Sequence, residues 1–153
     1  MALIIRECTI AELEAASNIK ELLAEYGNES SIKGLPHPYA KAEVYKTLER
    51  LGTIYVVGAW YNEVLIGFVI VFAPIMPHYS ARVAVGESLF VAKEYRKTGA
   101  GLKLIAKAEE YAKRVKSCGL LLSAPLGGIL AGVLPHIGYD ETNRIFFKGF
   151  PNE

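Results

Sequence analysis

The chain has 153 residues, of which 52% are hydrophobic and 22% charged, and its formal net charge is +1. This length favours one domain with its own core, and this composition excludes a disordered chain. So small a net charge provides no global field for nucleic acid or an acidic membrane surface, and we expect neither partner. Cys8 and Cys118 lie far apart without metal-ligand spacing, which favours a reduced, cytoplasmic protein with no metal.

The N-terminal third predicts one strand followed by two helices. Residues 2–7 form a short apolar run, and Thr9 with Glu12 has the spacing of a helix-capping box. Apolar residues then recur at helical spacing as far as Gly27, where we expect the helix to end. A second helical stripe spans residues 38–52.

The middle of the chain predicts antiparallel strands. Residues 53–61 and 64–73 are rich in Val, Ile, Tyr and Phe, and Asn62-Glu63 between them suits a tight turn. Residues 82–91 predict a third strand of the same series. Because these apolar runs are too short for a membrane helix and rich in β-branched residues, we interpret them as buried strands.

The C-terminal third predicts a helix over residues 101–117, a strand over 120–124, a short helix over 126–136 and a last strand over 145–150. The wholly apolar segment 120–124 is typical of a buried, parallel strand. The expected order is β-α-α-β-β-β-α-β-α-β. This order predicts a single α/β domain over residues 1–153, with a mixed, mostly antiparallel sheet flanked by helices.

The stretch VAKEYRKTGAGLKL places two cations and two glycines at the start of a predicted helix. A helix start offers unpaired N–H groups and a partial positive charge, which together suit a phosphate. Gly99 and Gly101 lack the side chains that would keep a phosphate away from the backbone, and Arg96 and Lys97 add positive charge. The pattern therefore predicts an anion site.

Two nucleotide-binding motifs match this stretch incompletely. A P-loop requires a lysine after its glycines, whereas Lys97-Thr98 precedes them. The dinucleotide motif requires a third glycine where Leu104 stands, and it normally opens a fold. NAD or ATP binding remains an alternative.

The pattern Arg96-x-x-Gly99-x-Gly101, between a strand ending in Val91 and an amphipathic helix, resembles the signature of the GNAT superfamily of acetyl-CoA-dependent N-acetyltransferases. The order of predicted elements is similar to theirs over essentially the whole chain. The resemblance implies acetyl-CoA as cosubstrate, a small-molecule or peptide amine as acceptor, and direct attack in a ternary complex. The alternative is a non-catalytic coenzyme A-binding module of the same fold.

The resemblance also implies roles for particular residues. The backbone amides that would hold the pyrophosphate are those of Arg96, Lys97, Thr98, Gly99, Ala100 and Gly101. The end of the preceding strand, Phe90 and Val91, would pair with the pantetheine arm, with Leu89 near the acetyl group. The Val91 N–H would donate to the carbonyl oxygen.

Glu87 is the candidate general base, because a free alkylamine is mostly protonated near neutral pH and must lose a proton before attack. By strand alternation, Glu87 would share one face with the apolar positions 83, 85, 89 and 91. A carboxylate in such surroundings is costly unless it has a partner or a function. A plain ion pair or a solvent-facing strand end is the alternative.

The family's usual general acid, a tyrosine four residues before a Gly-Phe pair, is not in place. The matching pair here is Gly138-Tyr139, and Leu134 occupies the tyrosine position. Tyr139, Ser123 and His136 are substitutes in principle.

We expect the acceptor pocket to form from the first two helices and nearby loops. The polar residues this involves are Glu29, His37, Tyr39, His78 and Tyr79. The apolar final strand, RIFFKGF, is free to pair with a second copy of the chain, so a homodimer is a candidate assembly.

Overall fold

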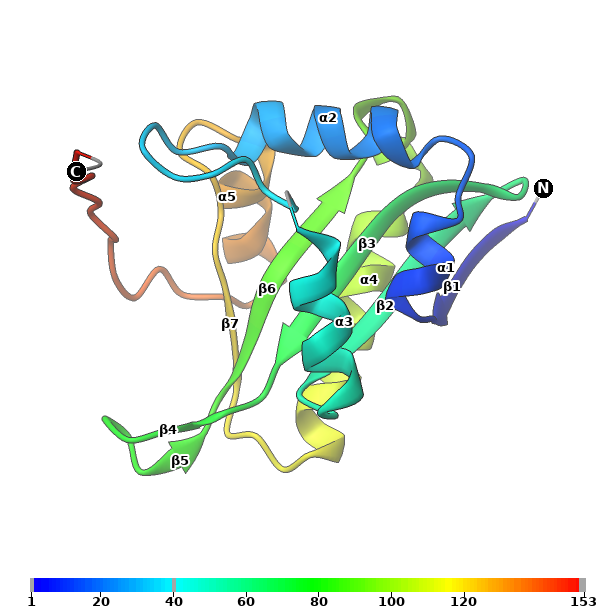
Figure 1. Cartoon of the computed structure of the whole chain (residues 1–153). Coiled ribbons are helices and arrows are strands. Elements are labelled where there is room, and N and C mark those ends of the chain that lie inside the picture. The colour runs from blue at the N-terminus through cyan, green and yellow to red at the C-terminus, as the bar shows by residue number, and fades with distance from the viewer. Residues whose placement is uncertain (1, 40, 152–153) are drawn as a thin grey trace.

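The computed structural model describes residues 2–39 and 41–151 and shows a main sheet with helices on both faces (Figure 1). The strands are β1 (Leu3–Glu7), β2 (Ile54–Tyr61), β3 (Val64–Phe72), β4 (Ile75–Met76), β5 (Ala81–Arg82), β6 (Ala84–Val91) and β7 (Leu120–Leu122). The helices are α1 (Ile10–Glu14), α2 (Ile19–Ser30), α3 (Ala42–Arg50), η1 (Lys93–Thr98), α4 (Ala100–Arg114), α5 (Ile129–Val133) and η2 (Leu134–Ile137). In the described chain, no helix combines the length and apolar character that crossing a membrane requires.

The main sheet has the strand order β1-β2-β3-β6-β7, and β4 pairs with β5 in a small hairpin of its own. Neighbouring strands of the main sheet are antiparallel except for β6 and β7, which are parallel. The β2–β3 turn is the predicted one, with Asn62 and Glu63 at φ values of 47° and 70°. The predicted single α/β domain with a mixed, mostly antiparallel sheet is therefore confirmed.

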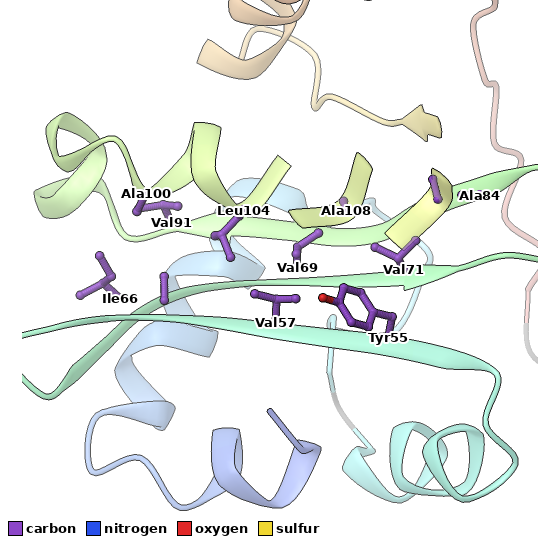
Figure 2. Close-up of a cluster of buried hydrophobic side chains, with 12 residues drawn as sticks. Tyr55, Val57, Ile66, Val69, Val71, Ala84, Val91, Ala100, Leu104 and Ala108 are labelled. Carbon is purple, nitrogen blue, oxygen red and sulfur yellow. The ribbon is translucent and has the colours of Figure 1, made fainter. Parts of the chain in front are cut away.

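Each face of the sheet buries an apolar cluster. On one face, Leu104 and Ala108 of α4 face Val69 and Val71 of β3 (Figure 2). The opposite face, beneath α1, α2 and α3, holds a cluster that includes Ile10, Leu13, Leu22, Phe68 and Phe90. The sheet lies between two layers of helices, so both of its surfaces are withdrawn from water.

The prediction that one helix follows the first strand and ends at Gly27 is wrong. The chain breaks the helix after Glu14, where the Asn18 side chain donates to the Leu65 carbonyl oxygen at 2.8 Å, and α2 then runs through Gly27. An ideal Cβ on Gly27 would lie 2.0 Å from the Nε2 atom of His37. Gly27 therefore allows the loop after α2 to pack against that helix. It does not end the helix, contrary to the prediction.

The predicted last strand over residues 145–150 is also wrong. Described residues 140–151 form no helix or strand, and Phe146 is 89% exposed. The apolar sequence has strand propensity, but a strand needs a neighbour to receive its hydrogen bonds, and in the described chain this segment pairs with no strand.

Gly67 allows the close approach of β3 to the end of β6. An ideal Cβ at this position would lie 2.4 Å from the Phe90 carbonyl oxygen and 3.1 Å from the Val91 Cα. We therefore expect Gly67→Ala to lower the free energy of unfolding by about 1–3 kcal/mol, because the strands must move apart. Chemical denaturation measures this change.

Gly132→Ala is the matched control, because an added Cβ there would meet no atom within 4 Å. Its stability should match or slightly exceed that of the parent chain, since Ala favours a helix over Gly. Equal stability of the two alanine variants would contradict the close contact at Gly67.

Candidate active site

The end of β6 presents main-chain groups away from the rest of the sheet. Ala92 donates its N–H to the Ile66 carbonyl oxygen at 2.8 Å, and Val91 lies opposite Gly67. In an antiparallel pair, successive residues point their N–H and C=O groups in opposite directions. The N–H groups of Val91 and Leu89 therefore face away from β3.

Beyond Gly86, this outward edge of β6 has no strand beside it among the described residues. The parallel pairing of β6 with β7 covers only Ala84 to Gly86, opposite Leu120 to Leu122. Beyond that point the two strands diverge, as Figure 1 shows. An extended ligand can pair with the free edge as a strand would. Phe90 was expected to offer its main chain to a ligand at this edge. Its N–H and C=O groups face β3 instead, and its side chain is buried.

The start of α4 follows this edge directly. Gly99 adopts a φ of 84°, in the left-handed region, and caps the 15-residue helix. Helical bonding begins with the Lys103 N–H to the Gly99 carbonyl oxygen, and the Ala100 N–H donates to the Thr98 side chain at 3.2 Å. The Gly101 and Leu102 N–H groups belong to the unpaired first turn.

Both motif glycines leave room for a ligand. An ideal Cβ on Gly99 would meet no atom within 4 Å, and one on Gly101 would meet only the Val91 Cγ2, at 3.9 Å. These glycines are therefore not demanded by packing within the chain. Open space, first-turn N–H groups and the positive end of a helix fit an anionic group such as a pyrophosphate.

The Arg96 side chain binds the end of β6 and helix α2. Its Nε donates to the Val91 carbonyl oxygen at 2.9 Å, and its guanidinium forms an ion pair with Glu29 of α2 at 2.5 Å. The Lys93 N–H similarly donates to Glu25 of α2 at 2.8 Å. Two carboxylates of α2 therefore hold the segment between β6 and α4.

A β-bulge changes the direction of Glu87. The β3–β6 register passes from Ile70 opposite Ser88 to Val71 opposite Gly86, which leaves Glu87 without a partner on β3. Leu89 and Val91 pack beneath α4, whereas Glu87 contacts α3 on the other face. The expectation that Glu87 shares a face with positions 89 and 91 is therefore wrong, because the extra residue reverses the alternation.

Both oxygens of the Glu87 carboxylate accept hydrogen bonds. Tyr45 of α3 donates to Oε1 at 2.7 Å, and the Ser88 hydroxyl donates to Oε2 at 2.6 Å. Burial, followed by the charge of Glu87, raises the pKa of Tyr45 above its ordinary value, and the same two causes raise the pKa of Tyr26. Glu87 thus lies half-buried near two phenols that remain neutral.

A cleft of about 290 Å³ opens beside this group. It is lined by Pro36, His37, Tyr39, Lys41, Val44 and Tyr45. The Tyr39 ring stacks on the Tyr45 ring with centroids 4.4 Å apart. The cleft therefore shares one aromatic wall, Tyr45, with the carboxylate of Glu87.

The structure brings together only part of the expected acceptor residues. His37 and Tyr39 line the cleft, whereas Glu29 pairs with Arg96. His78 and Tyr79 lie between β4 and β5, where their rings contact each other, and Tyr79 is 62% exposed. Sequence analysis missed Tyr45, which resembled one more apolar position of a helical stripe.

In the part of the chain that the structure describes, the hydrogen-bond donors to Glu87 are Tyr45 and Ser88, and none of the substitutes for the general acid is among them. The Tyr139 hydroxyl donates to Glu109 of α4 at 3.2 Å, and burial and that carboxylate raise the pKa of Tyr139. Ser123 and His136 are exposed, while Leu134 is buried in the core. Within the described residues, no group of three or more His, Cys, Asp or Glu side chains could hold a metal ion.

Comparison with known families identifies the class of protein. The model of the acetyltransferase (GNAT) family matches residues 17–124, which is more than half of the chain. The chain therefore belongs to the GNAT acetyltransferase family. Among curated proteins, none matches the chain by sequence.

Solved structures share this fold at low sequence identity. The ribosomal-protein-alanine N-acetyltransferase from Brucella melitensis biovar Abortus 2308 aligns with a TM-score of 0.72 at 19% identity, covering 98% of this chain and 100% of that one. AAC(6′)-Iy, in complex with the bisubstrate analog CoA-S-monomethyl-acetylneamine, aligns with a TM-score of 0.73 at 19% identity, covering 99% and 100%. A transcriptional regulator from Bacillus halodurans C-125 aligns with a TM-score of 0.75 at 20% identity, covering 97% and 100%. These similarities support the fold.

The raised pKa of Tyr45 predicts how stability depends on pH. The folded chain keeps this phenol protonated to higher pH than the unfolded chain does. The free energy of unfolding should therefore fall as the pH rises above about 10, the ordinary tyrosine value. In Tyr45→Phe this fall should be shallower, as urea denaturation between about pH 8 and 11 would measure.

Tyr79→Phe is the matched control, because Tyr79 is an exposed tyrosine outside the site. Its stability should follow the parent chain at every pH. An identical slope in Tyr45→Phe and the parent chain would contradict the raised pKa of this phenol.

Proposed function

We propose that this chain transfers an acetyl group from acetyl-CoA to a primary amine by direct attack in a ternary complex. The observation that carries the proposal is the free edge of β6, which leads directly to the open start of α4. This edge lies next to the carboxylate of Glu87, which the bulge in β6 turns toward the face of the sheet that α3 covers. Membership of the GNAT acetyltransferase family supports the same activity.

In this proposal the cofactor site consists mainly of backbone. The N–H groups of Leu89 and Val91 would pair with the extended arm of the cosubstrate. Its pyrophosphate would lie against the segment from Arg96 to Gly101, where the Gly101 N–H belongs to the unpaired first turn of α4. The Val91 N–H would also donate to the carbonyl oxygen on which negative charge develops during attack. When bound, acetyl-CoA supplies the acetyl group on a reactive thioester.

Glu87 would act as the general base. It would take the proton that the attacking amine loses, directly or through a water, as a nitrogen–carbon bond replaces the carbon–sulfur bond. Tyr45 and Ser88 would fix the carboxylate through their hydrogen bonds of 2.7 Å and 2.6 Å. The aromatic walls of the cleft and the negative charge of Glu87 favour an acceptor that carries a cationic amine.

A coenzyme A-binding module without turnover is the second candidate. Two observations favour it: Leu134 is buried where the family's usual tyrosine stands, and both Glu87 oxygens already have donors. Such a module would bind acetyl-CoA and release no coenzyme A with any amine. We also propose a reduced, cytoplasmic protein, since both Cys8 and Cys118 are free thiols.

Thermal unfolding with acetyl-CoA, coenzyme A, NAD or ATP tests the cofactor site. A ligand at about 100 times its Kd adds about 2.7 kcal/mol, which for this chain length raises Tm by roughly 5–10 °C. We expect this rise with acetyl-CoA and coenzyme A only. Gly101→Val should abolish it, because the valine side chain occupies the space at the start of α4 while an added Cβ disturbs no packing.

Gly119→Val is the matched control, because Gly119 also has open space around its Cβ position but lies outside the site. It should keep the full shift. A rise with NAD or ATP would favour a nucleotide site, and no rise with any of the four ligands would overturn the proposal.

Glu87→Gln tests the proposed base. We expect kcat to fall by about 10²–10⁴-fold with little change in acetyl-CoA affinity, because the amide keeps the shape but cannot accept the proton. Release of coenzyme A across a panel of amines measures this effect. Glu110→Gln, which alters an exposed carboxylate of α4, should leave kcat unchanged. Equal turnover of Glu87→Gln and the parent chain at about pH 6–9 would exclude Glu87 as base.

A further inference from the structure

The cleft beside Glu87 is small and has mainly apolar walls. It lies where the loop after α2 meets the start of α3, and Pro36, Tyr39, Val44 and Tyr45 provide aliphatic and aromatic groups. Its volume of about 290 Å³ is at the lower end of the range of ligand sites, roughly 300–1,000 Å³. A single ring fits such a space, whereas a ligand built of several sugar rings is larger than it.

The two polar residues that line this cleft favour a ligand with little positive charge of its own. The His37 Nδ1 atom lies 2.8 Å from the Pro38 carbonyl oxygen, and the opposite edge of the ring packs on Gly27. Lys41 is exposed and brings a positive charge to the cleft. Because this charge repels further cations, a ligand with one amino group suits the cleft better than a ligand with several.

Tyr39 forms an aromatic wall of the cleft in an unusual conformation. Its ring stacks on Tyr45 with centroids 4.4 Å apart, and its φ of 64° lies in the left-handed region. In the described chain its buried hydroxyl has no hydrogen-bond partner. Strained residues of this kind cluster at binding and active sites, and a buried polar atom normally has a partner. Both costs indicate a function for the Tyr39 ring beyond packing.

Tyr45 connects the cleft to the carboxylate of Glu87. Its ring lines the cleft, and its hydroxyl donates to the Glu87 Oε1 atom at 2.7 Å. Among the described residues that line the cleft, Glu87 itself is missing. A ligand with its ring in the cleft therefore needs a short chain to bring an amine to this carboxylate.

The negative charge of Glu87 extends to the stacked rings. Burial raises the pKa of the Tyr39 hydroxyl, and the charges of Glu14 and Glu87 raise it further. A cation gains energy both from a nearby carboxylate and from the faces of aromatic rings. The side of the cleft next to Glu87 thus suits an ammonium group, and the remainder suits an uncharged ring.

We propose that the acceptor is a monoamine whose amino group is joined by a short alkyl chain to one aromatic ring. The ring lies in the cleft beside Tyr39 and Tyr45, and the amine lies at Glu87. This inference rests on the proposed acetyl transfer and names its acceptor class. The neutral amine nitrogen bonds to the acetyl carbon, the carbon–sulfur bond breaks, and coenzyme A leaves as its thiolate. The proton that the nitrogen loses passes to Glu87.

Steady-state kinetics with a matched pair of amines tests the acceptor class. The pair is 2-phenylethylamine and ethylamine, which differ only in the ring, and spermidine and the aminoglycoside kanamycin complete the panel. We expect kcat/KM for 2-phenylethylamine to exceed the other three values by at least about tenfold, because only this amine fills the cleft with a ring.

Variants of the cleft test where the ring lies. Val44→Trp should raise KM for 2-phenylethylamine by at least about tenfold and leave kcat/KM for ethylamine unchanged, because it fills the cleft from a position that is 55% exposed. Leu51→Trp, at a 69% exposed position after α3, is the matched control and should change neither value. Tyr39→Phe should keep the preference for the ring, and Tyr39→Leu should weaken it.

The outcomes separate this inference from the proposed function. Equal kcat/KM for 2-phenylethylamine and ethylamine, or a preference for spermidine or kanamycin, would overturn the acceptor class and leave acetyl transfer standing. A preference for the ring that persists in Val44→Trp would also overturn it.

If no amine in the panel is acetylated, the proposed function fails, and calorimetric titration of 2-phenylethylamine into the chain with coenzyme A decides the inference. Binding that Val44→Trp weakens at least about tenfold, and Leu51→Trp does not, would support the cleft as a site for this class of amine. Absence of binding would overturn it.

Discussion

The hydrogen bond from the Ala92 N–H to the Ile66 carbonyl oxygen determines how the end of β6 faces. Because antiparallel pairing alternates, this bond commits Phe90 to the sheet and leaves Leu89 and Val91 facing outward. Gly67 permits the approach, and the short pairing with β7 leaves the outward edge uncovered. The geometry of the proposed cofactor site is therefore set mainly by how the strands pair, and the identity of the side chains contributes little to it.

Helix α2 links this edge to the face of the sheet that holds the proposed acceptor site. Glu25 accepts from the Lys93 backbone, and Glu29 pairs with Arg96, which also holds the Val91 carbonyl. The Arg96 and Glu29 side chains are 26% and 40% exposed, so the ion pair contributes little more than the 0.2–1 kcal/mol of a surface pair. Its role is geometric. The arginine of the motif orients the strand end, and in the proposed site the first turn of α4 would provide the partial positive charge for an anion.

Local patterns in the sequence were enough to predict the five strands of the main sheet, the Asn62-Glu63 turn and the start of α4. Features that depend on distant residues were not predictable. Gly27 looked like a helix end because its contact with His37 lies in a later loop. The bulge at Glu87 depends on the register with β3, and its partner Tyr45 is 42 residues away. The tail was predicted as a strand because propensity does not report whether a strand edge is available.

The bulge at Glu87 also affects how the leaving thiol would be protonated in the proposed reaction, because Leu134 stands where the family usually has a tyrosine as general acid. Glu87 and Tyr45 are joined at 2.7 Å, and burial and the carboxylate keep the phenol protonated. If Glu87 takes a proton from the amine, its charge disappears; the second cause of the raised pKa of Tyr45 is then removed, while burial, the larger cause, remains. Tyr45 then becomes a better donor, while a thiol with an ordinary pKa of about 8–9 needs little help to leave. In the proposed reaction, a carboxylate–phenol pair at the bulge would reduce the need for a separate general acid on the later helix.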